Sequence, residues 1–307
     1  MRLSCQRAGG NVGQEGRLGS LMIFGLGYTG LATARAASDA GWTVGATTRG
    51  AATVQAGITL SRFGAVRLDG VSHLLITAPP GDDGDPVLRA HLPAIRAARN
   101  LRWIGYLSTT GVYGDRGGGW VDEATSPAPH SARARRRVGA EAEWAAFSDR
   151  AAVDIFRLAG IYGPGRSAFD DLRAGTARRI DRPGHAFGRI HRDDIAGAVL
   201  AAMSQSPSPG LRVLNGNDDL PADSAEVVAE AARLLGVPAP PLTRFEDAAL
   251  SPMAMSFWAE NRKVSSRLTQ QLLGRRWAYP TYREGLAAIL AEEGRDGLGQ
   301  NGKVLRP

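Results

Sequence analysis

Cysteine is almost absent from this sequence, since Cys5 is the only one among 307 residues. A single cysteine can form neither an intramolecular disulfide nor a cysteine-rich metal site. Long apolar runs are also absent: no stretch approaches the roughly 18 consecutive apolar residues of a membrane-spanning helix. The first 20 residues lack the apolar core of a secretory signal, and the five histidines show no paired spacing typical of metal ligands. These absences predict a cytoplasmic protein with no membrane segment and no bound metal.

Lysine is nearly absent as well, because arginine supplies all but Lys263 and Lys303 of the 37 basic side chains. The net charge of +7 raises the question of a nucleic-acid partner. The arginines, however, are spread along the whole chain among aspartates and glutamates, and the sequence has no aromatic-interleaved basic stripe and no zinc-finger spacing. We therefore expect a small-molecule partner rather than a nucleic acid. Neither lysine lies in a P-loop, and the GxSxG and HExxH signatures are missing.

Short apolar runs alternate with longer helical segments after residue 20. The expected strands cover residues 21–25, 42–49, 65–69, 73–78, 102–109, 153–159 and 211–216. The expected helices cover residues 28–40, 86–99, 131–147, 193–203 and 222–236. Alternation of this kind is typical of parallel strands covered by helices on both faces. The pattern therefore predicts an α/β protein with a Rossmann-type, doubly wound parallel sheet.

A glycine turn joins the first expected strand to the first expected helix, with the sequence Gly25-Leu26-Gly27-Tyr28-Thr29-Gly30. In a dinucleotide site the first glycine permits the tight turn, the second lets the pyrophosphate approach the backbone, and the third lets helix and strand pack closely. The helix N-terminus offers free N–H groups to the phosphates. The alternative is a glycine turn that binds no ligand. The expected cofactor-binding residues are Gly25, Gly27, Tyr28, Thr29, Gly30, Thr48, Arg49, Thr77, Ala78 and Pro79.

The second expected strand ends without the acidic residue that holds the ribose hydroxyls in NAD-specific sites. No carboxylate occurs between Asp39 and Asp69, and Thr48 and Arg49 occupy the strand end instead. An arginine at this position can accept a 2′-phosphate. The sequence therefore predicts NADP(H) as the cofactor, in preference to NAD(H). The alternative is that Arg49 is a surface residue without this contact.

Four further segments, in the order in which they occur, complete a familiar set of motifs: LSTTGVYGD at 107–115, WVDEATSPAP at 120–129, FRLAGIYGPGR at 156–166 and RIHRDDIAGA at 189–198. Together with the glycine turn, the chain resembles the extended short-chain dehydrogenase/reductases, which include sugar-nucleotide epimerases and dehydratases. The resemblance implies an NAD(P)-binding domain over 21–163 and a smaller C-terminal substrate domain over 164–293, with segments that return to the sheet. Residues 1–20 and 294–307 are expected to be tails. Because many relatives pair through two long helices, it also implies a homodimer.

The chain departs from this family at two places. The usual first glycine is replaced by Phe24, so the turn reads GxGxxG. The catalytic Tyr-x-x-x-Lys pair is missing, because Arg133 and Arg137 stand at the tyrosine and lysine positions. The chain thus resembles an atypical, epimerase/dehydratase-like branch of the family.

The resemblance also indicates which residues could carry the remaining chemistry. Thr109 matches the residue that hydrogen-bonds the substrate oxygen, and Arg137 could replace the lysine at the nicotinamide ribose. Arg133 is one helical turn from Arg137, so the two share a face that suits an anionic substrate group. The alternative is a solvated helix face. Arginine is practically never deprotonated, so neither residue can act as an acid or base.

Tyr113, Tyr162 and His191 are the candidates for the missing proton donor, with Tyr113 preferred, and the latter two are also expected at the substrate. In the family such tyrosines more often support the fold, and a lone histidine is more often structural. Two functions remain. One is an NADP(H)-dependent oxidoreductase or epimerase that acts on a small anionic or sugar-like substrate. The other is a catalytically silent NADP(H)-binding sensor.

Overall fold

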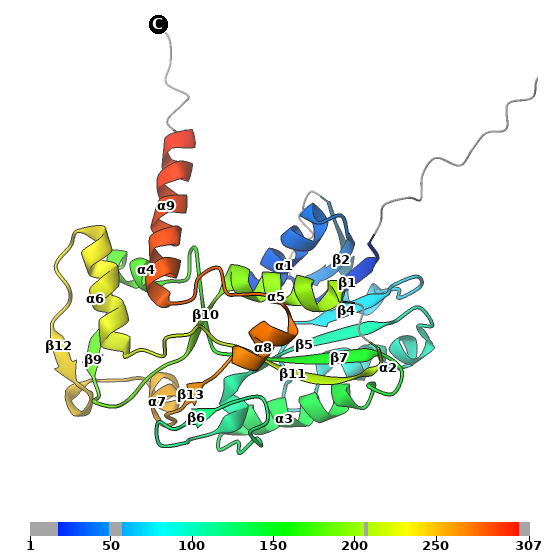
Figure 1. Ribbon diagram of the computed structural model, residues 1–307, viewed down its shortest axis with the longest axis horizontal. Coiled ribbons are helices and arrows are strands. Elements are labelled where there is room, and N and C mark those ends of the chain that lie inside the picture. Colours follow the sequence, from blue (N-terminus) through cyan, green and yellow to red (C-terminus); the bar gives the residue numbers. More distant parts are fainter. Residues whose placement is uncertain (1–17, 49–56, 206–207, 301–307) are drawn as a thin grey trace, which may run out of the picture.

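The central sheet has seven parallel strands in the order β11-β7-β5-β4-β1-β2-β3. The computed structural model describes residues 18–48, 57–205 and 208–300 (Figure 1). The strands are β1 (Ser20–Phe24), β2 (Thr43–Thr48), β3 (Ile58–Arg62), β4 (His73–Ile76), β5 (Trp103–Thr109), β7 (Ala152–Leu158) and β11 (Gly210–Gly216). This order, in which the chain winds outward from β1 in both directions, confirms the Rossmann-type sheet.

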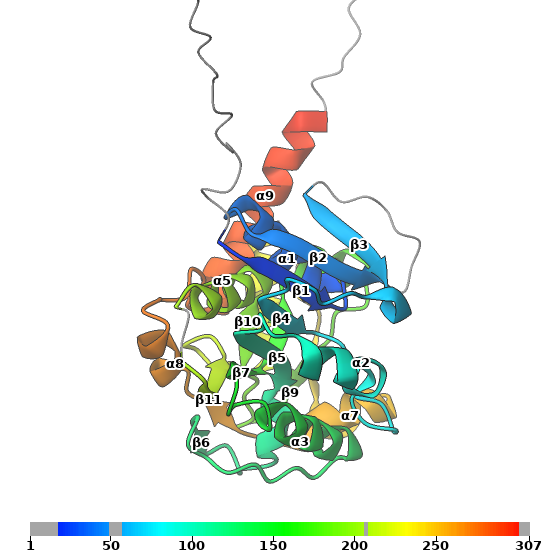
Figure 2. The same ribbon diagram turned by 90° about the vertical axis from the view of Figure 1, so that its right-hand side faces the viewer.

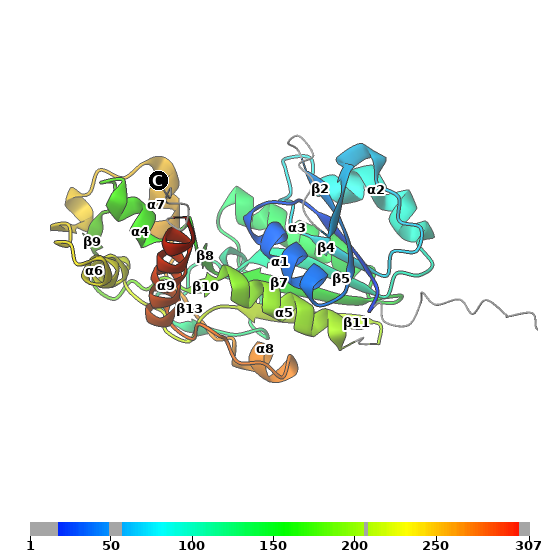
Figure 3. The ribbon, with the colours of Figure 1, turned by 90° about the horizontal axis from the view of Figure 1, so that it is seen from above.

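Helices cover both faces of the sheet. On one face lie α1 (Tyr28–Asp39) and α5 (Arg192–Ser204), which pack against each other. On the other lie α2 (Pro86–Ala97) and α3 (Ala132–Ala145) (Figures 2 and 3). Every residue of β4 and β7 is buried, as expected for central strands with apolar contacts on both sides.

A smaller part of the chain lies beyond the carboxyl end of the sheet (Figure 1). Its helices are α4 (Ala168–Arg173), α6 (Ser224–Leu235), α7 (Pro252–Trp258) and α9 (Tyr282–Gln300). Its strand pairs are β8 (Gly160–Tyr162) with β10 (Arg189–His191), and β9 (Arg179–Asp181) with β12 (Leu242–Arg244). A third pair, β6 (Trp120–Val121) with β13 (Lys263–Val264), joins a loop after β5 to the C-terminal region, and α8 (Arg267–Leu272) packs on β11.

The chain crosses between the two parts more than once. After β10 it returns to the sheet, where α5 packs on α1 and β11 pairs with β7. It then leaves again to form α6 and α7. The substrate part is therefore assembled from separated segments. Within the residues that the structure describes, no helix combines the length and apolar character needed to cross a membrane.

Two expected elements differ from the structure. The strand expected at 65–69 is wrong: the edge strand is β3, where Ile58 pairs with Val44, and Phe63–Ala65 form a 3-10 turn. Val66 and Leu68 are apolar because they pack in the core cluster beneath α2, not because they belong to a strand. At the C-terminus, α9 continues through Gln300 and so extends into the expected tail.

Candidate functional site

The turn between β1 and α1 requires two of its glycines for steric reasons. Gly25 has a φ of +111°, and a Cβ there would lie 2.5 Å from Oγ1 of Thr77. A Cβ on Gly30 would overlap the carbonyl oxygen of Gly25. Gly27 is different, because a Cβ there would meet no atom within 4 Å. The open space thus lies beside the glycine at which a pyrophosphate would approach the backbone.

The N-terminus of α1 suits an anion. Gly27 is its N-cap, no side chain caps the helix, and the first turn has no acidic residue. Its first N–H groups and the helix dipole are therefore available to phosphate oxygens. These features fit the pyrophosphate of a dinucleotide, which Gly27, Tyr28 and Thr29 would hold.

Two threonines fix the shape of this turn. Thr77 donates to the carbonyl oxygen of Gly25 at 2.6 Å. Thr47, which the sequence analysis did not select, accepts from the N–H of Gly25 at 3.0 Å through its hydroxyl. Ala78 and Pro79 directly follow Thr77 after the end of β4. These residues thus come from the ends of β2 and β4, the strands on either side of β1, where nucleotides bind in such sheets.

The residues expected to select the cofactor lie at the edge of the sheet. Thr48 ends β2, and Arg62, at the end of β3, is its partner in the strand register. Arg62 is exposed and was not selected from the sequence. Arg49 falls outside the described residues, so its prediction stays untested.

Tyr28 joins the glycine turn to the smaller part of the protein. Its hydroxyl donates to the carbonyl oxygen of Pro164 at 3.1 Å. The guanidinium groups of Arg192 and Arg166 lie 5.0 and 5.7 Å from the centre of its ring. Two cations therefore lie beside the residue that follows Gly27.

A cavity of about 920 Å³ lies between the carboxyl end of the sheet and the smaller part. It is strongly cationic, because five arginines line it and, among the described lining residues, Glu260 is the only acid. The arginines are Arg133, Arg137, Arg166, Arg189 and Arg262. Phe187, Phe257 and Trp258 form an aromatic wall. Arg166 also contacts the Tyr28 ring, so the cavity adjoins the glycine turn.

The structure brings three of the predicted residues to this cavity: Thr109, Arg133 and Arg137. Oγ1 of Thr109 accepts from the N–H of Gly111 at 3.1 Å, which leaves its hydroxyl proton to donate to a ligand. Nη1 of Arg137 donates to the carbonyl oxygen of Leu107 at 2.8 Å. The guanidinium of Arg133 lies 4.8 Å from the centre of the Phe257 ring. Two cations and one hydroxyl donor therefore face the same space.

The structure does not bring Tyr113 or His191 to this cavity. Tyr113 is fully buried, and its hydroxyl donates to Oδ1 of Asn215 at 2.8 Å. His191 is 1% exposed, and its Nδ1 accepts from the N–H of Asp193 as the cap of α5. Burial lowers the pKa of His191 to about 4, so the ring is neutral at pH 7 and does not titrate there. Both residues support the fold in this structure.

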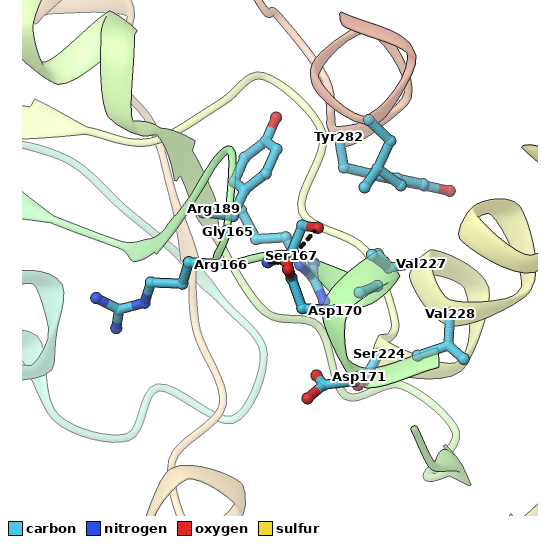
Figure 4. Close-up of a pocket in the computed structure, with 13 residues that line it drawn as sticks. Gly165, Arg166, Ser167, Asp170, Asp171, Arg189, Ser224, Val227, Val228 and Tyr282 are labelled. Carbon is cyan, nitrogen blue, oxygen red and sulfur yellow. Dashed lines mark hydrogen bonds between the residues drawn. The ribbon is translucent and has the colours of Figure 1, made fainter. Parts of the chain in front are cut away.

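Tyr162 lines a second cavity, of about 450 Å³, between α4, α6 and α9 (Figure 4). Burial raises the pKa of Tyr162, so its hydroxyl stays protonated. Arg166, Arg189 and Ser224 line both cavities, which therefore adjoin. Arg189 donates to the carbonyl oxygens of Phe187 and Ala222 at 2.9 and 3.0 Å, which fixes its charge at the boundary between the cavities.

The neutral state of His191 makes stability depend on pH. The folded pKa of about 4 lies below the usual 6.5, so the unfolded chain binds the proton more tightly. The stabilisation is complete above about pH 6.5 and is lost as the pH falls toward 4. The free energy of unfolding of the wild-type protein is therefore about 2 kcal/mol lower at pH 5 than at pH 7.

We expect His191→Asn, which keeps a side-chain cap for α5, to reduce the fall in Tm between about pH 7 and pH 5 by about 3 °C. Thermal melts at the two pH values measure this difference. His130→Asn, at an exposed histidine, should leave the fall in Tm unchanged. An equally steep fall in the His191 variant would contradict the predicted shift.

The residues that the sequence analysis missed come from positions without a motif or from distant segments. Ser108 precedes Thr109 and donates to Oε1 of Glu141 at 2.5 Å. Arg189 lies in segment 189–198, one of those on which the family resemblance rests. Its positive charge could have identified it as a candidate for binding an anionic substrate. Arg262 and Glu260 come from a region without regular periodicity. Among the residues described, no group of histidine, cysteine, aspartate and glutamate side chains could hold a metal ion.

The chain is similar to several known proteins. No protein-family model matches it. Protein YeeZ of Escherichia coli strain K12 is 30% identical over 251 residues, which cover 71% of this chain and 84% of YeeZ. A solved structure of a functionally unknown conserved protein from Silicibacter pomeroyi DSS is 46% identical, with a TM-score of 0.84, and covers 89% of this chain and 99% of its own. A solved structure of an NAD-dependent epimerase/dehydratase-like protein from Methylobacillus flagellatus is 26% identical, with a TM-score of 0.70. The match covers 90% of this chain and 99% of that one.

Two more distant structures share the fold and contain a cofactor. MoeE5 in complex with UDP-glucuronic acid and NAD is 20% identical, with a TM-score of 0.71, over 91% of this chain and 100% of its own. Human epimerase family protein SDR39U1 with NADPH is 18% identical, with a TM-score of 0.71, over 88% and 99%. The fold, the order of the sequence motifs and the extent of the match to YeeZ all indicate the same family. The chain belongs to the extended short-chain dehydrogenase/reductase family, as an atypical epimerase/dehydratase-like member related to YeeZ.

Proposed function

We propose that this protein is an NADP(H)-dependent oxidoreductase or epimerase that acts on a small anionic substrate with a hydroxyl or carbonyl group. The observation that carries the proposal is the cavity in which five arginines and the Thr109 hydroxyl face one space beside the glycine turn. Arginines bind carboxylate and phosphate groups well because their donors match these planar anions. A free hydroxyl at the end of a central strand suits the oxygen of a reacting C–O group.

The cofactor would lie across the strand ends from the glycine turn to Arg137. Gly27, Tyr28 and Thr29 would hold its pyrophosphate, and Arg137, fixed to the Leu107 carbonyl oxygen, would face its nicotinamide ribose. The nicotinamide supplies hydride transfer when it is bound. The absence of a carboxylate between Asp39 and Asp69, together with Arg49 and Arg62, supports NADP(H). MoeE5 with NAD and SDR39U1 with NADPH support a nicotinamide cofactor in general.

A second function, an NADP(H)-binding sensor without turnover, is favoured by one observation. Arginines stand where the family has its tyrosine and lysine. Among the described residues that line the cavity of about 920 Å³, called the main cavity from here on, there is neither a tyrosine nor a lysine. Turnover separates the two functions, whereas cofactor binding does not.

Calorimetric titration of the purified protein with NADPH and then NADH, at matched salt, tests the cofactor assignment. We expect NADPH to bind at least about tenfold more tightly, which corresponds to about 1.4 kcal/mol. Arg62→Met or Arg49→Met should remove this difference, while Arg99→Met, an exposed residue after α2, should not. Equal affinity for the two cofactors would contradict the NADP(H) preference. If neither binds, both proposed functions are wrong.

A further inference from the structure

Each hydride transfer to a carbonyl group must be matched by a proton transfer to its oxygen. In this protein the expected proton carriers do not reach the main cavity: Tyr113 is held on Asn215, and His191 caps α5. Tyr162 lines only the second cavity. If the protein is an enzyme as proposed above, another group in the main cavity must exchange the proton.

Most polar groups of the main cavity are unsuited to this task. Its arginines keep their proton at every ordinary pH. The Ser108 hydroxyl donates to Glu141, and the Ser131 hydroxyl accepts from the N–H of Ala134 as the cap of α3. Thr109 can donate a hydrogen bond but ionises far above neutral pH. Glu260 is the one acidic side chain among the described lining residues.

We propose that Glu260 is the catalytic acid–base residue of this site. Its Oε2 accepts from Nη1 of Arg262 at 2.6 Å, and its side chain is 13% exposed. No described residue hydrogen-bonds to its Oε1. That oxygen can therefore exchange a proton with a bound substrate while the other stays fixed by Arg262.

The backbone around Glu260 is fixed to the loop that follows Thr109. The carbonyl oxygen of Asn261 accepts from the N–H groups of Arg116 and Gly118 at 3.0 and 2.9 Å. Its N–H donates to Oδ1 of Asp115 at 2.7 Å. These bonds hold the segment against residues 115–118 of this loop, which gives Glu260 the rigid support that a catalytic group requires.

Arg262, which holds Glu260, also lies near Thr109. Nη1 of Arg262 also donates to the carbonyl oxygen of Gly114 at 3.0 Å. A Cβ placed on Gly111 would lie 3.4 Å from Oγ1 of Thr109 and 3.8 Å from Nη2 of Arg262. The hydroxyl expected at the substrate oxygen and the guanidinium that holds Glu260 therefore lie on the same side of Gly111.

The proposed step balances as a two-electron transfer. In reduction, protonated Glu260 would give its proton to the carbonyl oxygen of the substrate while the carbonyl carbon receives the hydride that a bound reduced nicotinamide would supply. The products would be an alcohol, the oxidised cofactor and the Glu260 carboxylate. In oxidation, the Glu260 carboxylate would take the hydroxyl proton as the oxidised cofactor accepts the hydride from the carbon.

The charged and titratable groups around this segment are Arg262, Arg133 over Phe257, Arg182 on the Trp258 carbonyl oxygen, Asp115 and His185. The hydrogen bond from the N–H of Asn261 lowers the pKa of Asp115, and burial lowers the pKa of His185. Both shifts move titration of these groups away from neutral pH.

The test is NADPH oxidation by the full chain with carboxylate-bearing aldehydes and ketones, beginning with 4-carboxybenzaldehyde and succinic semialdehyde, from about pH 5 to about pH 9. Glu260→Gln, which can still accept from Arg262, should lower kcat by at least about 100-fold throughout this pH range. Glu260→Asp should recover part of kcat. NADPH affinity should stay within about twofold of wild type.

Glu246→Gln is the matched control, because Glu246 also pairs with an arginine, Arg244, but its side chain is 65% exposed. It should leave kcat unchanged. If Glu260→Gln keeps the wild-type kcat, the assignment of Glu260 is overturned and the enzyme proposal stands. If wild-type protein binds NADPH but reduces no compound of this class, the enzyme proposal itself is overturned, and the role of Glu260 with it.

Discussion

Gly30→Ala is expected to destabilise the protein, whereas Gly27→Ala, three residues earlier in the same turn, should weaken cofactor binding and leave the fold intact. The new Cβ at Gly30 would overlap the Gly25 carbonyl oxygen, a backbone atom that cannot rotate away. Overpacking of this kind costs about 1–3 kcal/mol. At Gly27 the Cβ meets no atom within 4 Å, so it would occupy only the space that the pyrophosphate is expected to need.

Urea denaturation and NADPH calorimetry separate the two effects. We expect Gly27→Ala to weaken NADPH binding at least about tenfold. It should keep the wild-type free energy of unfolding within about 1 kcal/mol, the usual scale of an N-cap change to alanine, because Gly27 has a φ of −87° and the new Cβ meets no atom. Gly139→Ala is the control: Gly139 lies in α3, is exposed, and its Cβ would meet nothing. This change should raise stability by about 0.5–1 kcal/mol. Unchanged NADPH affinity in Gly27→Ala would place the cofactor elsewhere.

The glycine turn could be predicted because its geometry is encoded locally. Gly25 and Gly30 are five positions apart, and the strand and helix that flank them show their own patterns. The prediction of a strand at 65–69 was wrong because it depended on an apolar pattern alone. Val66 and Leu68 are apolar to fill the core under α2, and an apolar pattern alone does not distinguish packing from strand pairing.

The candidate site was only partly predictable. Thr109, Arg133 and Arg137 were found because the family motifs place them at the sheet end and on α3. Tyr113 follows Thr109 closely in sequence, yet its ring is buried beside Asn215, because a short 3-10 turn rotates it away from the cavity. Glu260 and Arg262 enter the cavity from more than 120 residues further along the chain, through hydrogen bonds between backbone segments. No local pattern encodes such a contact.

The ion pair between Arg157 and Glu141 gives the second large expected effect. Nη2 of Arg157 donates to Oε2 of Glu141 at 2.8 Å, and the two side chains are only 6% and 9% exposed, respectively. Ser108, which lines the cavity, donates to the other oxygen of Glu141 at 2.5 Å. Arg157→Met should lower the free energy of unfolding by about 3–5 kcal/mol, because it leaves a buried carboxylate without its partner.

The double variant Arg157→Met with Glu141→Leu should recover most of this loss, since a buried ion pair replaced by apolar groups is often nearly neutral. Urea denaturation of the wild type, both single variants and the double variant gives the coupling energy directly. Arg173→Met is the matched control, because Arg173 pairs with Glu293 on the surface, with side chains 45% and 32% exposed. It should cost no more than about 1 kcal/mol. If Arg157→Met lowers the free energy of unfolding as little as this control does, the buried ion pair does not stabilise the fold as predicted.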